Sequence, residues 1–323
     1  MKYKSFIIAV LAVWVIPWTM YAVAEQFLLK KTEPQPTAAA SESTAAEEKD
    51  TPYFVDVLMP DGSTIPMELN DYLSGVVLGE MPASFEREAL KAQAVVARTY
   101  TLKRQTSAPK HDGGAVCTDP SCCQAYCAEE AYLASGNTQA HLDKVKQATV
   151  DTGYFVLLYE GALIDATYFS CAGDRTEAAV AVWGTDVPYL QSVESPGEEI
   201  SRYYVDSVVF TAEGFMELLR ADLTDPPERW IGETTYTAGG GVDTIQIGGK
   251  VYRGTQLRQL LGLRSTDFQI TAIGETVTVT TKGYGHRVGM SQYGAQAMAL
   301  QGADWKQILS HYYPGTVPEI WEA

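Results

Sequence analysis

An apolar run near the N-terminus is the strongest constraint on how this chain folds. Residues 5–24 read SFIIAVLAVWVIPWTMYAVA and contain no charged side chain. At 1.5 Å per residue, about 20 residues cross a hydrocarbon core of about 30 Å. Two lysines precede the run, and Trp18 and Tyr21 lie near its far end, where aromatic rings suit the membrane interface. We expect residues 1–30 to form a single-pass transmembrane anchor.

A cleaved signal peptide is the alternative interpretation of the same run. The sequence Ala22-Val23-Ala24 resembles the small-residue site at which signal peptides are cut. The run is long for the apolar part of a signal, which favours the anchor. Either interpretation exports the rest of the chain, so we expect its bulk outside the cytoplasm, at the cell membrane.

The segment after this run has the composition of a flexible linker. Residues 31–50 are rich in Ala, Ser, Thr, Glu and Pro, and they contain no aliphatic side chain larger than alanine. Such a segment cannot bury a core. We therefore expect one folded domain over residues 51–323, tethered to the membrane by a spacer that suits a target away from the bilayer.

The overall charge excludes one class of partner. The 323 residues carry a formal net charge of −16. Proteins that bind nucleic acid neutralise phosphates with a basic surface, so we expect no nucleic-acid partner.

The domain pattern predicts the α+β class, with mixed helices and mainly antiparallel short strands. Helices are expected over residues 69–79, 85–105 and 141–150, the second capped by Ser84. Strand patterns cover residues 53–58 and 154–159. Thr211, Thr255, Ser291 and Asp304 are expected to cap further helices. Strands and helices follow one another irregularly, which argues against regular β-α-β units.

Three segments have the residue types of a polar site. They are residues 79–100, which begin GEMP and contain EALKAQA and ARTY; residues 168–177, YFSCAGDRTE; and residues 283–295, GYGHRVGMSQYGA, with HYYPGT at residues 311–316 behind them. Together they resemble the stage II sporulation protein D family, which includes amidase enhancers. The resemblance spans about residues 53–316.

The resemblance implies a peptidoglycan lytic transglycosylase. Such an enzyme cleaves glycan between N-acetylmuramic acid and N-acetylglucosamine, prefers strands stripped of stem peptides, and has its catalytic acid at the position of Glu80. It also implies wall remodelling at the septum and engulfment during sporulation, in the mother-cell membrane, with stage II sporulation proteins P and M as partners. A glycan-binding amidase enhancer without catalysis of its own remains the alternative.

Glu80 is also a reasonable acid on physical grounds. It follows the apolar residues 76–78 and precedes Met-Pro, and a carboxyl in apolar surroundings has a raised pKa and can donate a proton. One carboxyl suffices if the sugar's own 6-hydroxyl attacks, because proximity supplies the rate advantage. The competing interpretation is a carboxylate at a helix end, paired with Lys91 or Arg98.

Other polar residues of the three segments are candidates for binding sugar. Arg98 can bind a lactyl carboxylate or form a structural ion pair, and the rest offer hydroxyl, amide, imidazole or aromatic groups. The expected substrate-binding residues are Arg98, Tyr168, Ser170, Arg175, Thr176, Glu177, His286, Gln292 and Tyr293. Members of the family that this chain resembles often have glycine at the position of Arg287. The arginine adds bulk and charge beside His286, and we expect it to disturb the sugar contacts there.

A loop rich in cysteine predicts a metal site. Residues 111–127 hold four of the five cysteines and one histidine. We expect zinc, bound by His111, Cys117 and Cys123, with Cys122, Cys127, water or Glu80 as the fourth ligand. A disulfide is the alternative, which an oxidising exterior permits. A zinc hydrolase is disfavoured, because the chain has no H-E-x-x-H motif and zinc held by thiolates is usually structural.

Overall fold

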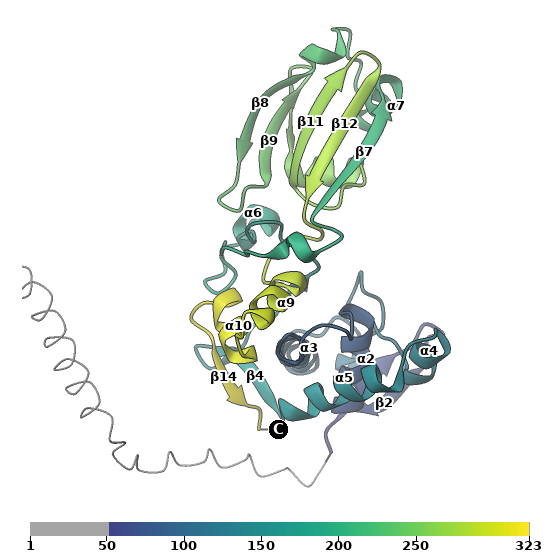
Figure 1. Ribbon diagram of the computed structural model, residues 1–323, viewed down its shortest axis with the longest axis vertical. Coiled ribbons are helices and arrows are strands. Elements are labelled where there is room, and N and C mark those ends of the chain that lie inside the picture. The colour runs from purple at the N-terminus through teal and green to yellow at the C-terminus, as the bar shows by residue number, and fades with distance from the viewer. Residues whose placement is uncertain (1–51, 323) are drawn as a thin grey trace, which may run out of the picture. The chain divides into compact units, whose positions relative to one another are not determined.

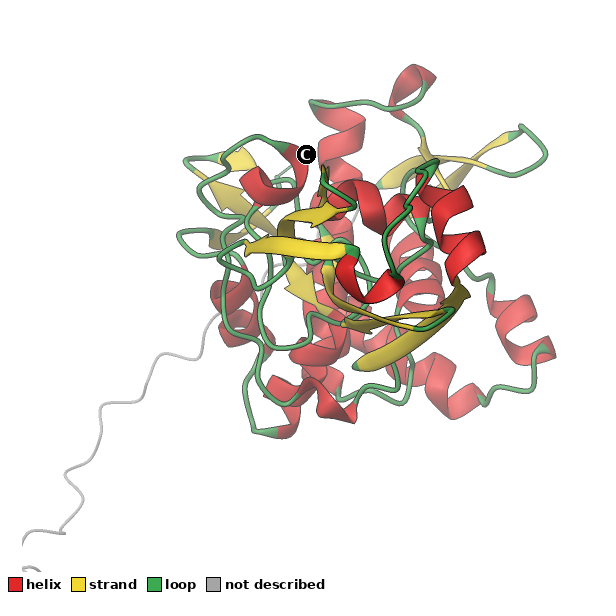
Figure 2. Cartoon of the chain, turned by 90° about the horizontal axis from the view of Figure 1, so that it is seen from above, coloured by secondary structure: helices red, strands yellow, loops and turns green. Residues whose placement is uncertain are grey.

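The computed structural model describes residues 52–322. The predicted anchor and linker, residues 1–50, lie outside the described residues. No helix within residues 52–322 combines the length and the apolar character that a membrane crossing requires. The described part mixes helices with short strands that pair mostly in antiparallel fashion, as the sequence predicts (Figures 1 and 2).

Two separate parts of this domain each bury a core of their own. We call residues 52–204 and 283–322 the body, and residues 205–282, which interrupt it, the β lobe. The body buries two clusters of apolar side chains, and the β lobe buries a third. The two parts are therefore stabilised by different sets of contacts.

Helices build most of the body. The longest, α3, is viewed nearly end-on in Figure 1, with α2, α5, α9 and α10 around it. The predicted helix over residues 85–105 is thus confirmed, and those over 69–79 and 141–150 are confirmed with small shifts of their ends. The body helices are α2 (Leu69–Glu80), α3 (Arg87–Thr106), α4 (Glu129–Ala134), α5 (Gln139–Asp151), α6 (Ala179–Trp183), α9 (Gln292–Leu300) and α10 (Trp305–Tyr312), with 3-10 turns at Asp112–Gly114 and Glu198–Ile200.

Short strands connect the body helices in three small sheets. Their orders are β2-β1-β3, β14-β4-β5 and β13-β6, and the pairs β1–β3 and β13–β6 are parallel. The strands are β1 (Phe54–Leu58), β2 (Thr64–Glu68), β3 (Val116–Cys117), β4 (Phe155–Tyr159), β5 (Ala162–Leu163), β6 (Tyr168–Phe169), β13 (Met290–Ser291) and β14 (Val317–Ile320).

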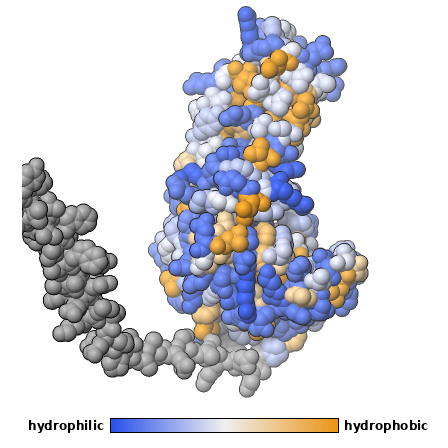
Figure 3. Space-filling view, viewed as in Figure 1, coloured by the Kyte–Doolittle hydropathy of each residue, from blue (hydrophilic) through white to orange (hydrophobic). Residues whose placement is uncertain are grey.

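The β lobe consists of two three-stranded antiparallel sheets and two short helices. Its sheets have the orders β10-β9-β8 and β11-β12-β7. The elements are β7 (Val205–Thr211), α7 (Ala212–Leu219), β8 (Ile231–Tyr236), β9 (Val242–Ile247), β10 (Lys250–Arg253), α8 (Gly254–Leu260), β11 (Asp267–Ile273) and β12 (Thr276–Lys282), with a 3-10 turn at Pro227–Arg229. Apolar side chains also reach the surface of this lobe, which shows orange patches in Figure 3.

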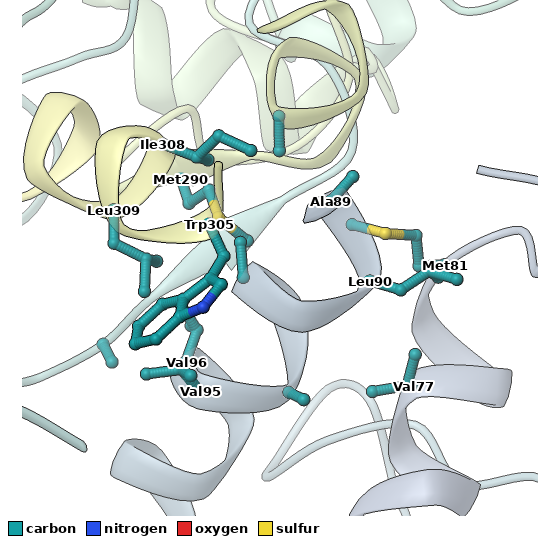
Figure 4. Close-up of a cluster of buried hydrophobic side chains, with 14 of the residues drawn as sticks. Val77, Met81, Ala89, Leu90, Val95, Val96, Met290, Trp305, Ile308 and Leu309 are labelled. Carbon is teal, nitrogen blue, oxygen red and sulfur yellow. The ribbon is translucent and has the colours of Figure 1, made fainter. Parts of the chain in front are cut away.

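The largest core cluster surrounds α3. Figure 4 shows Trp305 and Leu309 of α10 facing Val95 and Val96 of α3, while Leu90 lies near Met81 at the end of α2. These side chains are almost completely buried. Burying a large apolar side chain contributes about 1.5–3 kcal/mol, so this cluster fixes the end of α2 against α3.

Helix ends divide into those that the sequence predicts and those that it does not. Thr211, Ser291 and Asp304 accept hydrogen bonds from the first turn of their helices, as expected. Ser84 is not the cap of α3: Glu86 holds that position, with no side-chain cap bond. Thr255 is not a cap either, because α8 begins one residue earlier at Gly254.

Candidate functional site

A large cleft of about 1010 Å³ opens in the body. Its walls come from the end of α2, the cysteine loop, β6, and the loop that leads into α9. All three sequence segments predicted to form a site contribute side chains to it. No residue of the β lobe lines the cleft.

Glu80 lies in this cleft as the last residue of α2. The helix stops there because Met81 is extended, the conformation that a following proline favours. Burial raises the pKa of the Glu80 carboxyl, although the Ala125 N–H, 2.6 Å from Oε1, and the Tyr168 hydroxyl act in the opposite direction. The negative end of the helix dipole also disfavours the charged form. Glu80 is therefore suited to hold a proton and donate it.

Strand pairing brings the second and third segments together beside Glu80. Parallel strands β6 and β13 pair Tyr168 with Met290, and the Tyr293 N–H donates to the Ser170 carbonyl at 3.0 Å. Segments more than 100 residues apart in sequence thereby form one wall. Tyr168 stays protonated, because burial holds the pKa of its hydroxyl well above the ordinary value.

His286 is held between two aromatic rings on the same wall. Its ring centroid lies 5.6 Å from that of Phe169 and 5.3 Å from that of Trp183. Burial first, and Arg258 second, lower the pKa of His286 to about 4. The imidazole is therefore neutral near pH 7. Its Nδ1 accepts the Val288 N–H, which leaves Nε2 as the donor.

The structure places five of the nine predicted substrate-binding residues in the cleft. These are Tyr168, Ser170, His286, Gln292 and Tyr293. Within the described residues, the Nε2 group of Gln292 is buried without a partner, so a donor is available there. The other four predicted residues, Arg98, Arg175, Thr176 and Glu177, do not line the cleft.

Arg98 is a structural residue of the body. Its side chain is fully buried and donates to the carbonyls of Thr149 and Phe155 at 3.2 and 3.1 Å. Further bonds reach Thr152 and Asn70. The guanidinium thus joins α3 to the end of α5 and to β4. It does not line the cleft, and Glu88 pairs with Lys91 rather than with Arg98.

Thr176 and Arg175 hold the chain that follows β6. The Thr176 hydroxyl is buried and exchanges hydrogen bonds with the backbone of Val193 and Gln191. Arg175 forms an ion pair with Glu194 at 3.0 Å. Both residues therefore stabilise the loop that follows β6, which is the alternative to a role in sugar binding.

Glu177 belongs to a buried junction with Arg287. Both side chains are almost fully buried, and Arg287 Nη1 lies 3.4 Å from Glu177 Oε1. Arg287 also donates to the carbonyls of Ala172 and Gly239. Its φ of 65° lies in the left-handed region, where glycine is favoured. The Arg287 side chain points into the junction, so the expected disturbance beside His286 is not seen.

Sequence reasoning missed several cleft residues outside the three segments. Trp183, Arg202 and Tyr203 line the cleft, as does Lys110. Trp183 is 47% exposed, although it is a large aromatic residue. The Arg-Tyr-Tyr run at residues 202–204 was the available signal, but its place beside the cleft depends on tertiary contacts.

The cysteine loop brings four possible metal ligands together. Ligand atoms of His111, Cys117, Cys122 and Cys123 all lie within 4.8 Å of one another. His111 Nε2 is 3.5 Å from Cys122 Sγ and 3.6 Å from Cys123 Sγ. All five cysteines of the chain are free thiols, and Cys127 is not a member of the group. The same loop donates the Ala125 N–H to Glu80, so it supports the acid directly.

Comparison with known proteins finds relatives that cover most of this chain. A family model described as stage II sporulation protein matches residues 63–159. Stage II sporulation protein D of Bacillus amyloliquefaciens is 38% identical, over 83% of this chain and 79% of that protein. The protein of the same name from Bacillus subtilis (strain 168) is 37% identical, over 85% and 84%.

A second kind of relative is an amidase enhancer of Bacillus subtilis (strain 168). It is 29% identical over 76% of this chain, but the match covers 40% of that longer protein. The stage II sporulation proteins D match over most of both partners, and this extent of similarity decides the family. The chain belongs to the stage II sporulation protein D family.

Proposed function

We propose that this protein is a lytic transglycosylase that cleaves peptide-stripped glycan between N-acetylmuramic acid and N-acetylglucosamine. The observation that carries the proposal is the charge pattern of the cleft: among residues 52–322, Glu80 is the one carboxyl group that lines it. Hydrolytic glycosidases generally need two carboxyl groups, one of which directs water or forms a covalent bond. A transglycosylase that uses the substrate's own hydroxyl needs one.

Glu80 acts first as an acid and then as a base. Its proton passes to the glycosidic oxygen, the bond from that oxygen to the muramic C1 breaks, and positive charge develops on the muramic ring. The resulting carboxylate, stabilised by the Ala125 N–H, then accepts the proton of the muramic 6-hydroxyl. The 6-oxygen bonds to C1 and closes a 1,6-anhydro ring, without added water.

The remaining walls suit a sugar chain. Tyr203, Tyr284 and Tyr293 offer aromatic faces on which sugar rings can stack, and Gln292 offers its unpartnered amide donor. Neutral His286 can donate from Nε2 without adding charge. These groups orient the strand so that the 6-hydroxyl and C1 stay close together.

The same wall loop fits a zinc ion. Three sulfur atoms and one imidazole nitrogen within 4.8 Å form the donor set of a closed, structural tetrahedral site. His111, Cys117, Cys122 and Cys123 would hold the ion, and Glu80 would remain free to carry its proton. The metal would supply rigidity to the loop that carries Ala125. Elemental analysis should find about one zinc per chain; a chain without zinc and with Cys117 or Cys123 in a disulfide contradicts this assignment.

A glycan-binding amidase enhancer is the second candidate, favoured by the 29% identity to such a protein. The two functions separate when the protein is incubated with glycan strands with and without stem peptides. Release of short fragments from the peptide-free strands supports the enzyme. Binding without fragments, together with stimulation of an added amidase, supports the enhancer and overturns the first proposal.

The biological setting is part of the same proposal. The matched relatives are named for stage II of sporulation, so we place this protein in septal wall remodelling and engulfment. It would act from the mother-cell membrane through residues 1–30, beside stage II sporulation proteins P and M. Deletion in a spore-forming host should block engulfment, and co-purification tests the two partners.

A further inference from the structure

The charge of the cleft is opposite in sign to the net charge of the whole protein. The whole chain carries a net charge of −16, yet the charged residues that line the cleft are Lys110, Arg202 and Glu80. Glu80 has a raised pKa, which favours its neutral form. The cleft is therefore cationic in an acidic protein, and such a site concentrates anionic ligands.

Arg202 is the cation of the cleft best placed to bind an anion. Its guanidinium carbon lies 4.6 Å from the ring centroid of Tyr203, and one amino group donates to the Tyr203 hydroxyl. Among residues 52–322, Arg202 has no carboxylate partner. The ring holds the guanidinium in one orientation, and its remaining donors stay available for a planar, two-oxygen acceptor.

Lys110 and Arg264 are already engaged. Lys110 donates to the Cys122 carbonyl and lies over the Tyr100 ring. Arg264 lies near the rings of Tyr203 and Tyr284 but pairs with Asp206 at 3.1 Å.

We propose that Arg202 binds the lactyl carboxylate of a muramic acid residue that has lost its stem peptide. This inference rests on the proposed function and names what the cleft recognises in its substrate. A stem peptide converts the lactyl carboxylate into a neutral amide, whereas a stripped strand carries a negative charge on every muramic residue. A planar carboxylate matches the paired donors of a guanidinium. The neighbouring Tyr203 and Tyr293 rings, 6.2 Å apart between centroids, provide a stacking surface for the attached sugar.

The test compares two glycans that differ only in this charge. One is peptide-free glycan, and the other is the same glycan with its lactyl carboxylates converted to methylamides. Steady-state cleavage is measured for the full-length protein and for Arg202→Met, in detergent because of the apolar N-terminal run. On the carboxylate glycan, Arg202→Met should raise KM by about tenfold, as loss of an exposed charge-assisted contact predicts. On the methylamide glycan, the two proteins should have equal KM.

Matched variants and salt refine the result. Arg253→Met removes an exposed cation of the β lobe and should leave KM unchanged. Arg202→Lys should recover part of the lost affinity, since a point charge remains without the paired donors. Salt should raise the wild-type KM toward that of Arg202→Met on the carboxylate glycan, because screening weakens exposed charge pairs.

Several outcomes overturn the proposal. An equal rise of KM on both glycans shows that Arg202 acts through its shape, and no rise on either shows that it does not contact the substrate. Competition by a soluble phosphate polymer, with both glycans bound equally well, assigns the site to another anion. If the wild type cleaves neither glycan, the proposed function fails. The binding affinities of the wild type and of Arg202→Met for both glycans, measured by titration, then test the role of Arg202 alone. A preference for the carboxylate glycan that Arg202→Met abolishes supports the inference, and equal affinities overturn it.

Discussion

The body and the β lobe are connected through the same chain, yet they contribute differently to the cleft. Among residues 52–322, every side chain that lines the cleft belongs to the body. The β lobe is inserted between Tyr204 and Gly283, whose backbones are hydrogen-bonded at 2.9 Å, next to the cleft residues Tyr203 and Tyr284. The lobe therefore adjoins the cleft at the neck of its insertion without supplying a wall.

A buried junction links the lobe to the chain beside the cleft. Arg287 follows His286, which lines the cleft, and its guanidinium binds Glu177 of the body and the Gly239 carbonyl of the lobe. Glu177 in turn accepts bonds from Thr237 and the Gly241 N–H. Two carboxylates therefore have different surroundings: Glu80 lines the cleft, and Glu177 attaches the lobe to the body.

Replacement of Glu80 should give the largest effect on activity. Glu80→Gln keeps the size of the side chain but cannot donate the proton, and no second acid of residues 52–322 lines the cleft. Glycan cleavage should fall by about 1000-fold or more, with the unfolding midpoint nearly unchanged. Initial rates on peptide-free glycan and urea unfolding measure the two quantities. A variant that keeps about a tenth of the wild-type rate or more would contradict the proposed role of Glu80.

Replacement of Arg287 should give the largest effect on stability. Arg287→Ala leaves the Glu177 carboxylate buried without its cation, which costs about 3–5 kcal/mol of unfolding free energy. Arg287→Gly should cost about 1–2 kcal/mol less, because glycine relieves the left-handed backbone. Urea unfolding measures both variants. If Ala and Gly are equally stable, the backbone at this position is not strained.

The neutral His286 predicts a pH dependence of stability. Its folded pKa of about 4 lies below the ordinary value of 6.5, so the unfolded chain binds the proton more readily. The stability due to this group is present above pH 6.5 and is lost as the pH falls through 4. Between these values, the wild type should lose more unfolding free energy than His286→Asn. Parallel pH profiles for the two proteins contradict a neutral imidazole at this position.

Glu88 should have the smallest effect, confined to the body. Its carboxylate pairs with Lys91 at 2.7 Å and accepts the Trp305 N–H at 3.0 Å, at the start of α10. Glu88→Ala should lower the unfolding free energy by about 1 kcal/mol, because one helix-end bond and one exposed ion pair are lost. The rate of cleavage of peptide-free glycan should remain within about twofold of the wild-type rate, because the activation free energy should change by less than about 0.5 kcal/mol. A large loss of activity would show that α10 positions the cleft.

Local sequence signals predicted the body well. Helical spacing located α3, and the extended Met81 before Pro82 followed from the sequence, so Glu80 at a helix end was predictable. The cluster of His111 with cysteines was also visible, although Cys122 was one of several choices for the fourth position.

Tertiary contacts decided what the sequence could not predict. Arg98 and Glu177 have the polar character of ligands, but long-range packing buries them, and only the fold reveals that their partners are backbone groups or Arg287. Arg202 lies outside every motif and reaches the cleft because the chain returns there before the β lobe. Motifs therefore predicted the candidate acid and one wall of the cleft, while the place of Arg202 required the structure.

The mass of the released muramic ends tests the central claim most directly. A single carboxyl group has no partner to direct water, so the 6-hydroxyl must close the ring. Digestion of peptide-free glycan, followed by mass spectrometry, should show 1,6-anhydro ends that are one water lighter than hydrolytic ends and non-reducing. Reducing ends that carry the extra water would contradict a cleft with Glu80 as its single carboxyl group.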